Sequence, residues 1–210
     1  MDSCRRPIKT RSATWAKRIA GIFIDKGISP NRISIASVVF AFAGTAALNL
    51  DHGIIGSICC AAGIQLRLLC NLLDGMVAVE GGKKSPIGSL YNEFPDRIAD
   101  TLLIVGLGYA IGFVELGWFA ALGATLTAYV RVFGGSLALR QNFSGPMAKQ
   151  HRMAVMTAGL IANAIESSVL GTHQALLISL VVIAVGSVVT CITRTLAISR
   201  QLKGTPHVDQ

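Results

Sequence analysis

The chain alternates between long apolar stretches and short polar connections. A bilayer has a hydrocarbon core roughly 30 Å thick, and a helix needs about 20 mainly apolar residues to cross it. Six stretches meet this requirement. The pattern therefore predicts an all-α membrane protein, a bundle of six transmembrane helices at residues 33–50, 54–79, 87–113, 116–139, 153–170 and 175–198.

Residues 13–28, before the first span, carry apolar and basic side chains in alternation. This pattern predicts an amphipathic helix that lies in the membrane interface. Pro30 then interrupts the pattern ahead of the first span. The sequence thus divides into a cytoplasmic N-terminus with its amphipathic helix, one six-helix domain and a cytoplasmic tail, at residues 1–32, 33–198 and 199–210.

The composition agrees with a membrane protein, with 52% hydrophobic residues, 14% charged residues and a mean hydropathy of +0.58. The net charge is +8, and the Lys and Arg residues outside the predicted spans lie at the chain ends and in alternate connections, whereas residues 51–53, 114–116 and 171–174 contain none. Since basic residues stay on the cytoplasmic side, both termini are predicted to be cytoplasmic. The charge therefore indicates topology and anionic lipid, with no nucleic-acid partner. The basic residues counted are Arg5, Arg6, Lys9, Arg11, Lys17, Arg18, Lys26, Arg32, Lys83, Lys84, Arg140, Lys149, Arg152, Arg200 and Lys203.

Polar side chains interrupt the second and third spans near their cytoplasmic ends. Asn71 and Asp74 are three residues apart, so they share one face of a helix. Asn92, Asp96 and Asp100 follow at intervals of four and share a face of the next helix. A charged side chain at membrane depth costs about 2.5 to 3.5 kcal/mol on insertion scales, which favours a functional role. Two facing stripes of oxygen ligands predict a site for a hard cation such as magnesium, shared with substrate phosphates.

These residues resemble the signature of the CDP-alcohol phosphatidyltransferase family, Asp-x2-Asp-Gly-x2-Ala-Arg-x8-Gly-x3-Asp-x3-Asp. The chain matches its spacing throughout, but Asn71 and Asn92 replace the first and third Asp, and Val79 replaces the Arg. Asparagine offers a carbonyl oxygen without charge, so divalent cations should bind less tightly. The matching positions are Asn71, Asp74, Gly75, Ala78, Val79, Gly88, Asn92 and Asp96.

The resemblance implies an integral-membrane enzyme of phospholipid synthesis that transfers the phosphatidyl group of CDP-diacylglycerol to a hydroxyl acceptor and releases CMP. It implies Mg²⁺ or Mn²⁺ as cofactor, and Asp96 is the predicted general base. It also suggests a homodimer. The predicted metal ligands are Asn71, Asp74, Asn92 and Asp96, with Asp100 and Glu93 as acids that compensate for the asparagines; Gly75, Ala78 and Gly88 are predicted to flank the nucleotide.

Basic residues around the fourth-to-fifth connection are predicted to hold the acceptor. Arg131, Lys149 and Arg152 are able to bind phosphate through charge-assisted hydrogen bonds. Positive-inside topology explains Lys149 and Arg152 equally well, whereas Arg131 lies within a span and needs an anionic partner or water. Glycerol 3-phosphate is the first expectation for the acceptor and an inositol phosphate the second.

Two other functions remain open at this stage. A catalytically impaired paralogue would keep the fold and bind lipid or nucleotide without turnover. An ion-coupled transporter would also use intramembrane carboxylates, and Pro95 is the one residue that favours it by breaking the third helix. Transporters tend to spread such acids across the membrane depth, whereas five of the eleven acids here lie between Asp74 and Asp100.

Overall fold

The computed structural model describes residues 13–82, 86–139 and 142–204. Several basic residues used to predict the topology lie outside these ranges, namely Arg5, Arg6, Lys9, Arg11, Lys83, Lys84 and Arg140. The described residues form seven helices and no strand, which confirms the all-α fold. The helices are α1 (Thr14–Asp25), α2 (Pro30–Leu50), α3 (Ile54–Glu80), α4 (Gly88–Ala110), α5 (Val114–Ser136), α6 (Lys149–Val169) and α7 (Gln174–Gly204).

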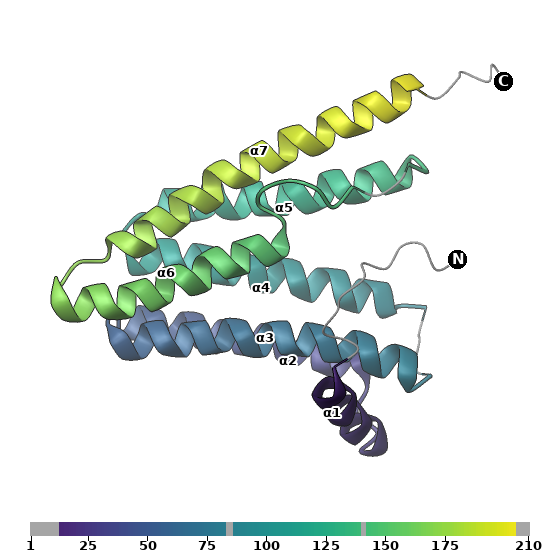
Figure 1. Cartoon of the computed structure of the whole chain (residues 1–210), viewed down its shortest axis with the longest axis horizontal. Helices are drawn as coiled ribbons and strands as arrows, with labels where there is room; N and C mark the ends of the chain where they lie inside the picture. The colour runs from purple at the N-terminus through teal and green to yellow at the C-terminus, as the bar shows by residue number, and fades with distance from the viewer. Residues whose placement is uncertain (1–12, 83–85, 140–141, 205–210) are drawn as a thin grey trace.

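The six long helices form a closed ring in the order α2, α3, α6, α7, α5 and α4. Figure 1 shows them running roughly side by side, with the short helix α1 lying across one end near α3. Helices α3 and α4 are consecutive in the chain, but their backbones barely touch because α2 packs against both of them. Any contact between the polar residues of α3 and α4 must therefore be made by side chains that reach across the ring.

Four of the helices are long and apolar enough to cross a membrane, namely Pro30–Leu50, Ile54–Glu80, Val114–Ser136 and the stretch Gln174–Lys203. Helices α4 and α6 coincide with predicted spans but are not among these four within the described residues. They carry the charged residues of the site, such as Asp96 and Asp100 on α4 and Arg152 on α6, and these lower their apolar content. The membrane character of the protein is supported, whereas the six-span bundle is not confirmed.

Helix α1 has the two faces expected of an interfacial helix. Ala16 and Ala20 are fully buried, and α1 packs against α3. Trp15 and Ile22 are exposed, as are basic residues of the same helix. Ser29 then caps α2 by accepting a hydrogen bond from the backbone N–H of Arg32, with proline at the start of the helix.

Glycines allow α2 and α3 to pack closely. A Cβ atom on Gly63 would lie 2.7 Å from the backbone oxygen of Phe40 and 3.1 Å from the Cα atom of Gly44. Small residues at such positions let helix backbones approach each other in a membrane. This contact sets the position of α3, which carries one wall of the site.

Substituting Gly63 by alanine should therefore destabilise the protein by about 1 to 3 kcal/mol, because the methyl group would meet backbone atoms and force α2 and α3 apart. Thermal unfolding in detergent measures the effect. Gly21→Ala is the matched control, since a Cβ at Gly21 of α1 meets nothing within 4 Å. Equal midpoints for the two variants would contradict this account of the α2–α3 contact.

The connection between α5 and α6 folds back into the bundle. The backbone N–H of Met147 donates to Oγ1 of Thr190 at 2.9 Å, and Nε of Arg194 donates to the backbone oxygen of Ser144 at 2.9 Å. Met147 and its neighbour Ala148 are buried. As a result α6 begins at Lys149, four residues before the predicted start, and the residues expected in a solvated loop lie at the depth of the acids on α4.

Candidate functional site

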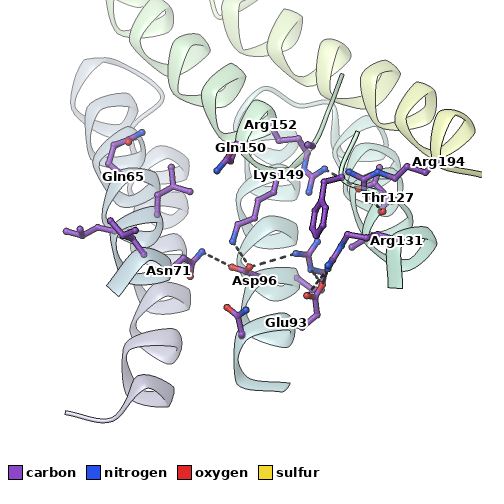
Figure 2. Close-up of a pocket in the computed structure, with 18 of the residues that line it drawn as sticks. Gln65, Asn71, Glu93, Asp96, Thr127, Arg131, Lys149, Gln150, Arg152 and Arg194 are labelled. Atoms are coloured by element: carbon purple, nitrogen blue, oxygen red, sulfur yellow. Dashed lines mark hydrogen bonds and ion pairs between the residues drawn. The ribbon is translucent and has the colours of Figure 1, made fainter. Parts of the chain in front are cut away.

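A cavity of about 580 Å³ opens at the end of the ring where α1 lies. One wall is apolar and is made by Trp15 of α1 with Leu68, Leu69 and Leu72 of α3. The opposite wall is polar and is built from α4, α5, α6 and α7 (Figure 2). Its charged residues are Glu93, Asp96, Arg97, Arg131, Lys149, Arg152 and Arg194.

Asp96 lies at the centre of the polar wall, where three helices meet. Its Oδ1 atom accepts a hydrogen bond from Nδ2 of Asn71 on α3 at 2.7 Å. Its Oδ2 atom pairs with the ammonium group of Lys149 on α6. Figure 2 shows both side chains directed at Asp96. The predicted meeting of the two polar stripes therefore occurs at the Asn71–Asp96 pair.

Asp100 lies one helical turn deeper and is bound by two arginines. Its Oδ1 atom accepts from Nη2 of Arg67 at 2.5 Å, and its Oδ2 atom accepts from Nη2 of Arg152 at 2.9 Å. All three side chains are at least nine-tenths buried. With both carboxylate oxygens engaged by guanidinium groups, this arrangement disfavours the predicted metal-ligand role of Asp100, which stays a prediction.

Arg67 is a site residue that the sequence analysis missed. It is fully buried on α3, and its Nη2 atom also contacts the backbone oxygen of Asp96 at 3.2 Å and Oδ1 of Asp96 at 3.4 Å. It lies one turn before Asn71, so it shares the polar face of α3. An arginine inside an apolar span needs an anionic partner, and that signal was available in the sequence.

Glu93 and Arg131 form a second pair at the edge of the cavity. Nη2 of Arg131 donates to both carboxylate oxygens of Glu93 at 2.9 Å, and the guanidinium lies 5.4 Å from the ring centre of Phe143. Arg131 is thus supplied with the anionic partner that its position in a span requires. Because Arg131 binds both of its carboxylate oxygens, Glu93 is disfavoured as a metal ligand. That role of Glu93 stays a prediction.

Arg194 of α7 is another missed residue of the polar wall. Its Nη1 atom donates to the backbone oxygen of Thr127 at 2.6 Å, close to Arg152, whose Nη1 atom contacts Oγ1 of Thr127 at 3.3 Å. Like Arg67, Arg194 interrupts a strongly apolar stretch, which is a signal that the sequence analysis did not use. Arg152 and Arg194 therefore lie next to each other at the back of the cavity (Figure 2).

The other predicted residues lie away from this wall or at its rim. Asp74 is buried and accepts a hydrogen bond from Oγ of Ser34 on α2 at 2.6 Å, so one of its oxygens faces α2. Asn92 is exposed and lines the cavity. Gly75, Ala78 and Gly88 are partly buried and are not among the lining residues, and their nucleotide-binding role stays a prediction.

The charges of the cavity favour an anionic ligand. Five cationic side chains line it, against the two carboxylates of Glu93 and Asp96. A cleft with an excess of one sign raises the local concentration of ligands of the opposite sign. Arginine and lysine side chains bind phosphate through short, charge-assisted hydrogen bonds. The site is thus suited to phosphates rather than to neutral or cationic ligands.

The oxygen donors near the cavity are of the type that a hard divalent cation binds, but few of them carry a negative charge. Asp74 and the amide oxygens of Asn71 and Asn92 are oxygen donors of the kind that magnesium and manganese take. No group of three or more His, Cys, Asp or Glu side chains suitable for a metal occurs in the part of the chain that the structure describes. A cation would therefore be bound with ligands from substrate phosphates.

Three curated proteins are similar to this chain in sequence, and no family model matches it. A phosphatidylinositol phosphate synthase of Streptomyces avermitilis is 27% identical over 192 residues, covering 87% of this chain and 77% of the relative. A bifunctional IPC transferase and DIPP synthase of Rubrobacter xylanophilus is 29% identical over 71% of this chain and 35% of its own length. An archaetidylinositol phosphate synthase of Aeropyrum pernix is 36% identical over 45% of this chain and 49% of its own length.

Solved structures share the fold. A phosphatidylinositol phosphate synthase of Mycobacterium tuberculosis with CDP-DAG bound superposes with a TM-score of 0.77 at 21% identity, covering 94% of this chain and 98% of the other. The same synthase in complex with manganese and citrate gives a TM-score of 0.75, covering 93% and 92%. Together with the sequence relatives, these findings confirm the resemblance inferred from the signature residues.

Proposed function

We propose that this chain, a member of the CDP-alcohol phosphatidyltransferase family, transfers the phosphatidyl group of CDP-diacylglycerol to a phosphorylated inositol and releases CMP. The observation that carries the proposal is the cationic wall of the cavity beside Asp96, which is suited to a phosphorylated acceptor. Relatives are named for phosphatidylinositol phosphate and archaetidylinositol phosphate synthesis. Glycerol 3-phosphate, the first expectation from the sequence, is not supported by these relatives.

The acceptor phosphate is proposed to lie against Arg131, Lys149 and Arg152, joined by Arg194. These side chains line one continuous side of the cavity. Arg152 is held from behind by Asp100 and by the backbone oxygen of Met147 at 2.7 Å, so its guanidinium is preorganised rather than free to rotate. Preorganised donors bind a ligand with less loss of side-chain entropy.

Asp96 is proposed to act as the general base. The acceptor hydroxyl gives its proton to the Asp96 carboxylate while its oxygen forms a bond to the phosphorus that carries diacylglycerol. The bond between that phosphorus and the oxygen of CMP breaks, and CMP leaves with the bonding electrons. Asn71 orients the carboxylate through its 2.7 Å hydrogen bond. A divalent cation, when bound, would neutralise charge on the diphosphate, and Asp74, Asn71 and Asn92 are the residues proposed to hold it.

The placement in the membrane extends this proposal. We propose that α2 to α7 all cross the bilayer, with the charged residues of α4 and α6 turned into the ring, as intramembrane charges usually are. The cavity and both termini face the cytoplasm in this arrangement, where water-soluble acceptor and CMP are available. The apolar wall at Trp15 and Leu69 would lie beside the lipid tails. A homodimer and the division into residues 1–32, 33–198 and 199–210 are retained as proposals.

Release of CMP from CDP-diacylglycerol by the detergent-purified chain, with Mg²⁺ or Mn²⁺ present, tests the proposed acceptor. Inositol phosphate should give the fastest release, at least about tenfold faster than unphosphorylated inositol at equal concentration, since hydrogen bonds to a charged group contribute about 1.5 to 3 kcal/mol. Inositol is the matched control because it lacks only the phosphate. Faster CMP release with glycerol 3-phosphate than with inositol phosphate would contradict the proposed acceptor. No CMP release with any acceptor would indicate a catalytically impaired paralogue.

A further inference from the structure

We propose that Lys149 is a built-in cation at Asp96, so that this site binds a single divalent cation, at Asp74. The proposal rests on the proposed function, because it concerns how the same site neutralises the substrate diphosphate. It is carried by the side-chain contacts of Asp96, Asp74 and Lys149. The contacts of Asp96 and Lys149 occupy the place where a second metal ion would bind, whereas those of Asp74 leave one of its oxygens for a cation.

The signature positions of this chain carry only two carboxylates. Asn71 and Asn92 are uncharged, which leaves Asp74 and Asp96. The two nearby acids do not replace the missing charges, because each is already engaged by arginine. Asp100 is bound by Arg67 and Arg152, and Glu93 is bound through both oxygens by Arg131.

Asp96 itself is engaged on both oxygens by nitrogen donors. Asn71 donates to Oδ1 at 2.7 Å, and the Lys149 ammonium pairs with Oδ2. Arg67 adds a third contact, 3.4 Å from Oδ1. A divalent cation at Asp96 would have to displace the ammonium group of Lys149. It would then remain beside the guanidinium groups of Arg67 and Arg97, which lie 3.4 Å and 3.9 Å from the carboxylate oxygens of Asp96. These contacts therefore disfavour Asp96 as a metal ligand while Lys149 is present.

Asp74 has a different environment. In the described part of the chain it takes part in no ion pair, and Ser34 is bound to only one of its oxygens. It lies close enough to Asp96 and Lys149 to interact with both of their charges. Asn71 presents its amide nitrogen to Asp96, so its carbonyl oxygen is the atom left for a cation. Asp74 is thus the one signature carboxylate able to anchor a metal ion.

Lys149 combines this role with access to the ligand. Its side chain is 25% exposed and lines the cavity, while the folded-back connection before α6 holds it at the depth of Asp96. An ammonium group fixed there, between the acceptor phosphate and the diphosphate, offers both a positive charge that does not depend on metal concentration. The chain should accordingly bind fewer divalent cations than a site with four carboxylates would.

Counting bound Mn²⁺ by electron paramagnetic resonance, on the detergent-purified full chain, tests the proposal. The wild-type protein should bind one Mn²⁺ per chain, and Asp74→Asn should bind none. Lys149→Met should bind its single ion about tenfold more tightly, because a nearby positive charge is gone. Lys203→Met is the control, since it removes the same charge from the exposed end of α7 and should leave Mn²⁺ affinity unchanged.

The second metal site should appear only when Lys149 is removed and a carboxylate is restored. Asn92→Asp alone should still bind one Mn²⁺, whereas Asn92→Asp combined with Lys149→Met should bind two. Two ions in the wild-type protein, or one ion in the double variant, would overturn the proposal. The number of Mn²⁺ ions bound by the wild-type protein tests the proposal even if a variant does not fold.

CMP release by the wild-type protein is measured on the same samples and separates the two proposals. Turnover with two bound ions would refute the role of Lys149 and leave the proposed function intact. One bound ion without turnover on any acceptor would refute the proposed function alone.

Discussion

Replacement of Asp96 by asparagine should lower the rate of CMP release about 10³-fold, within the range typical for loss of a general base. Asparagine has nearly the same size and keeps an oxygen toward Lys149, but it cannot accept the proton of the acceptor hydroxyl. The KM for CDP-diacylglycerol should change little, since the apolar wall and the other cations remain. Steady-state rates with saturating inositol phosphate give the measurement.

Glu80→Gln is the control for this substitution, because Glu80 is an exposed acid at the end of α3 and outside the cavity. It should retain full activity. If Asp96→Asn keeps more than about a tenth of the wild-type rate, Asp96 is not the base, and another group must take the proton.

Substitution of Asp100 by alanine should destabilise the protein by about 3 to 5 kcal/mol, the range for breaking a buried ion pair from one side. The reason is that Arg67 and Arg152, which are 0% and 1% exposed, would both lose a carboxylate partner. A thermal unfolding midpoint in detergent, well below that of the wild-type protein, is the expected result. Activity should fall together with stability, because Arg152 loses its orientation in the cavity.

A double variant shows whether the ion pair is responsible. Arg67→Met combined with Asp100→Ala should lose less stability than the sum of the two single variants, because Asp100→Ala alone leaves the buried Arg67 guanidinium without this carboxylate and the double change removes that guanidinium as well. Arg152 loses Asp100 in both the single and the double variant, so its contribution cancels in the comparison. Strict additivity would mean that the 2.5 Å contact between Arg67 and Asp100 does not contribute through pairing. Glu80→Ala, at an exposed position, should leave the unfolding midpoint unchanged.

The helices could be predicted because their signals are local. The length of each apolar stretch, the position of Pro30 and the amphipathic pattern of α1 depend only on neighbouring residues. Every long helix begins within four residues of its predicted start, and α7 extends furthest beyond its predicted end, to Gly204. The spacing of the signature residues also depends only on helical periodicity. It correctly predicted that Asn71 of one helix meets Asp96 of the next.

The surroundings of Asp96 could not be predicted because they depend on which helices are neighbours in the ring. The two polar stripes were predicted to face each other, but α2 packs against both α3 and α4 and leaves a cavity between their polar faces. Nothing local indicates that the connection before Lys149 folds back into the bundle. Its burial depends on distant contacts with Thr190 and Arg194 of α7.

Arg67, in contrast, could have been predicted as a site residue, because the sequence contains a local signal for it. An arginine within an apolar stretch requires an anionic partner or water, and this argument was applied only to Arg131. Applied equally to Arg67 and Arg194, it would have placed both in the site. It would also have indicated a guanidinium group beside the acids of α4, where the structure has Arg67 bound to Asp100.

The fate of the phosphorus atom tests the proposed chemistry. CDP-diacylglycerol carrying ³²P only in the phosphate attached to diacylglycerol is incubated with the purified chain, Mg²⁺ or Mn²⁺, and inositol phosphate. We predict that the label appears in a new, more polar lipid, in an amount equal to the unlabelled CMP released, and only when inositol phosphate is present. Label that stays in CDP-diacylglycerol, or that enters water-soluble products, would contradict phosphatidyl transfer to this acceptor.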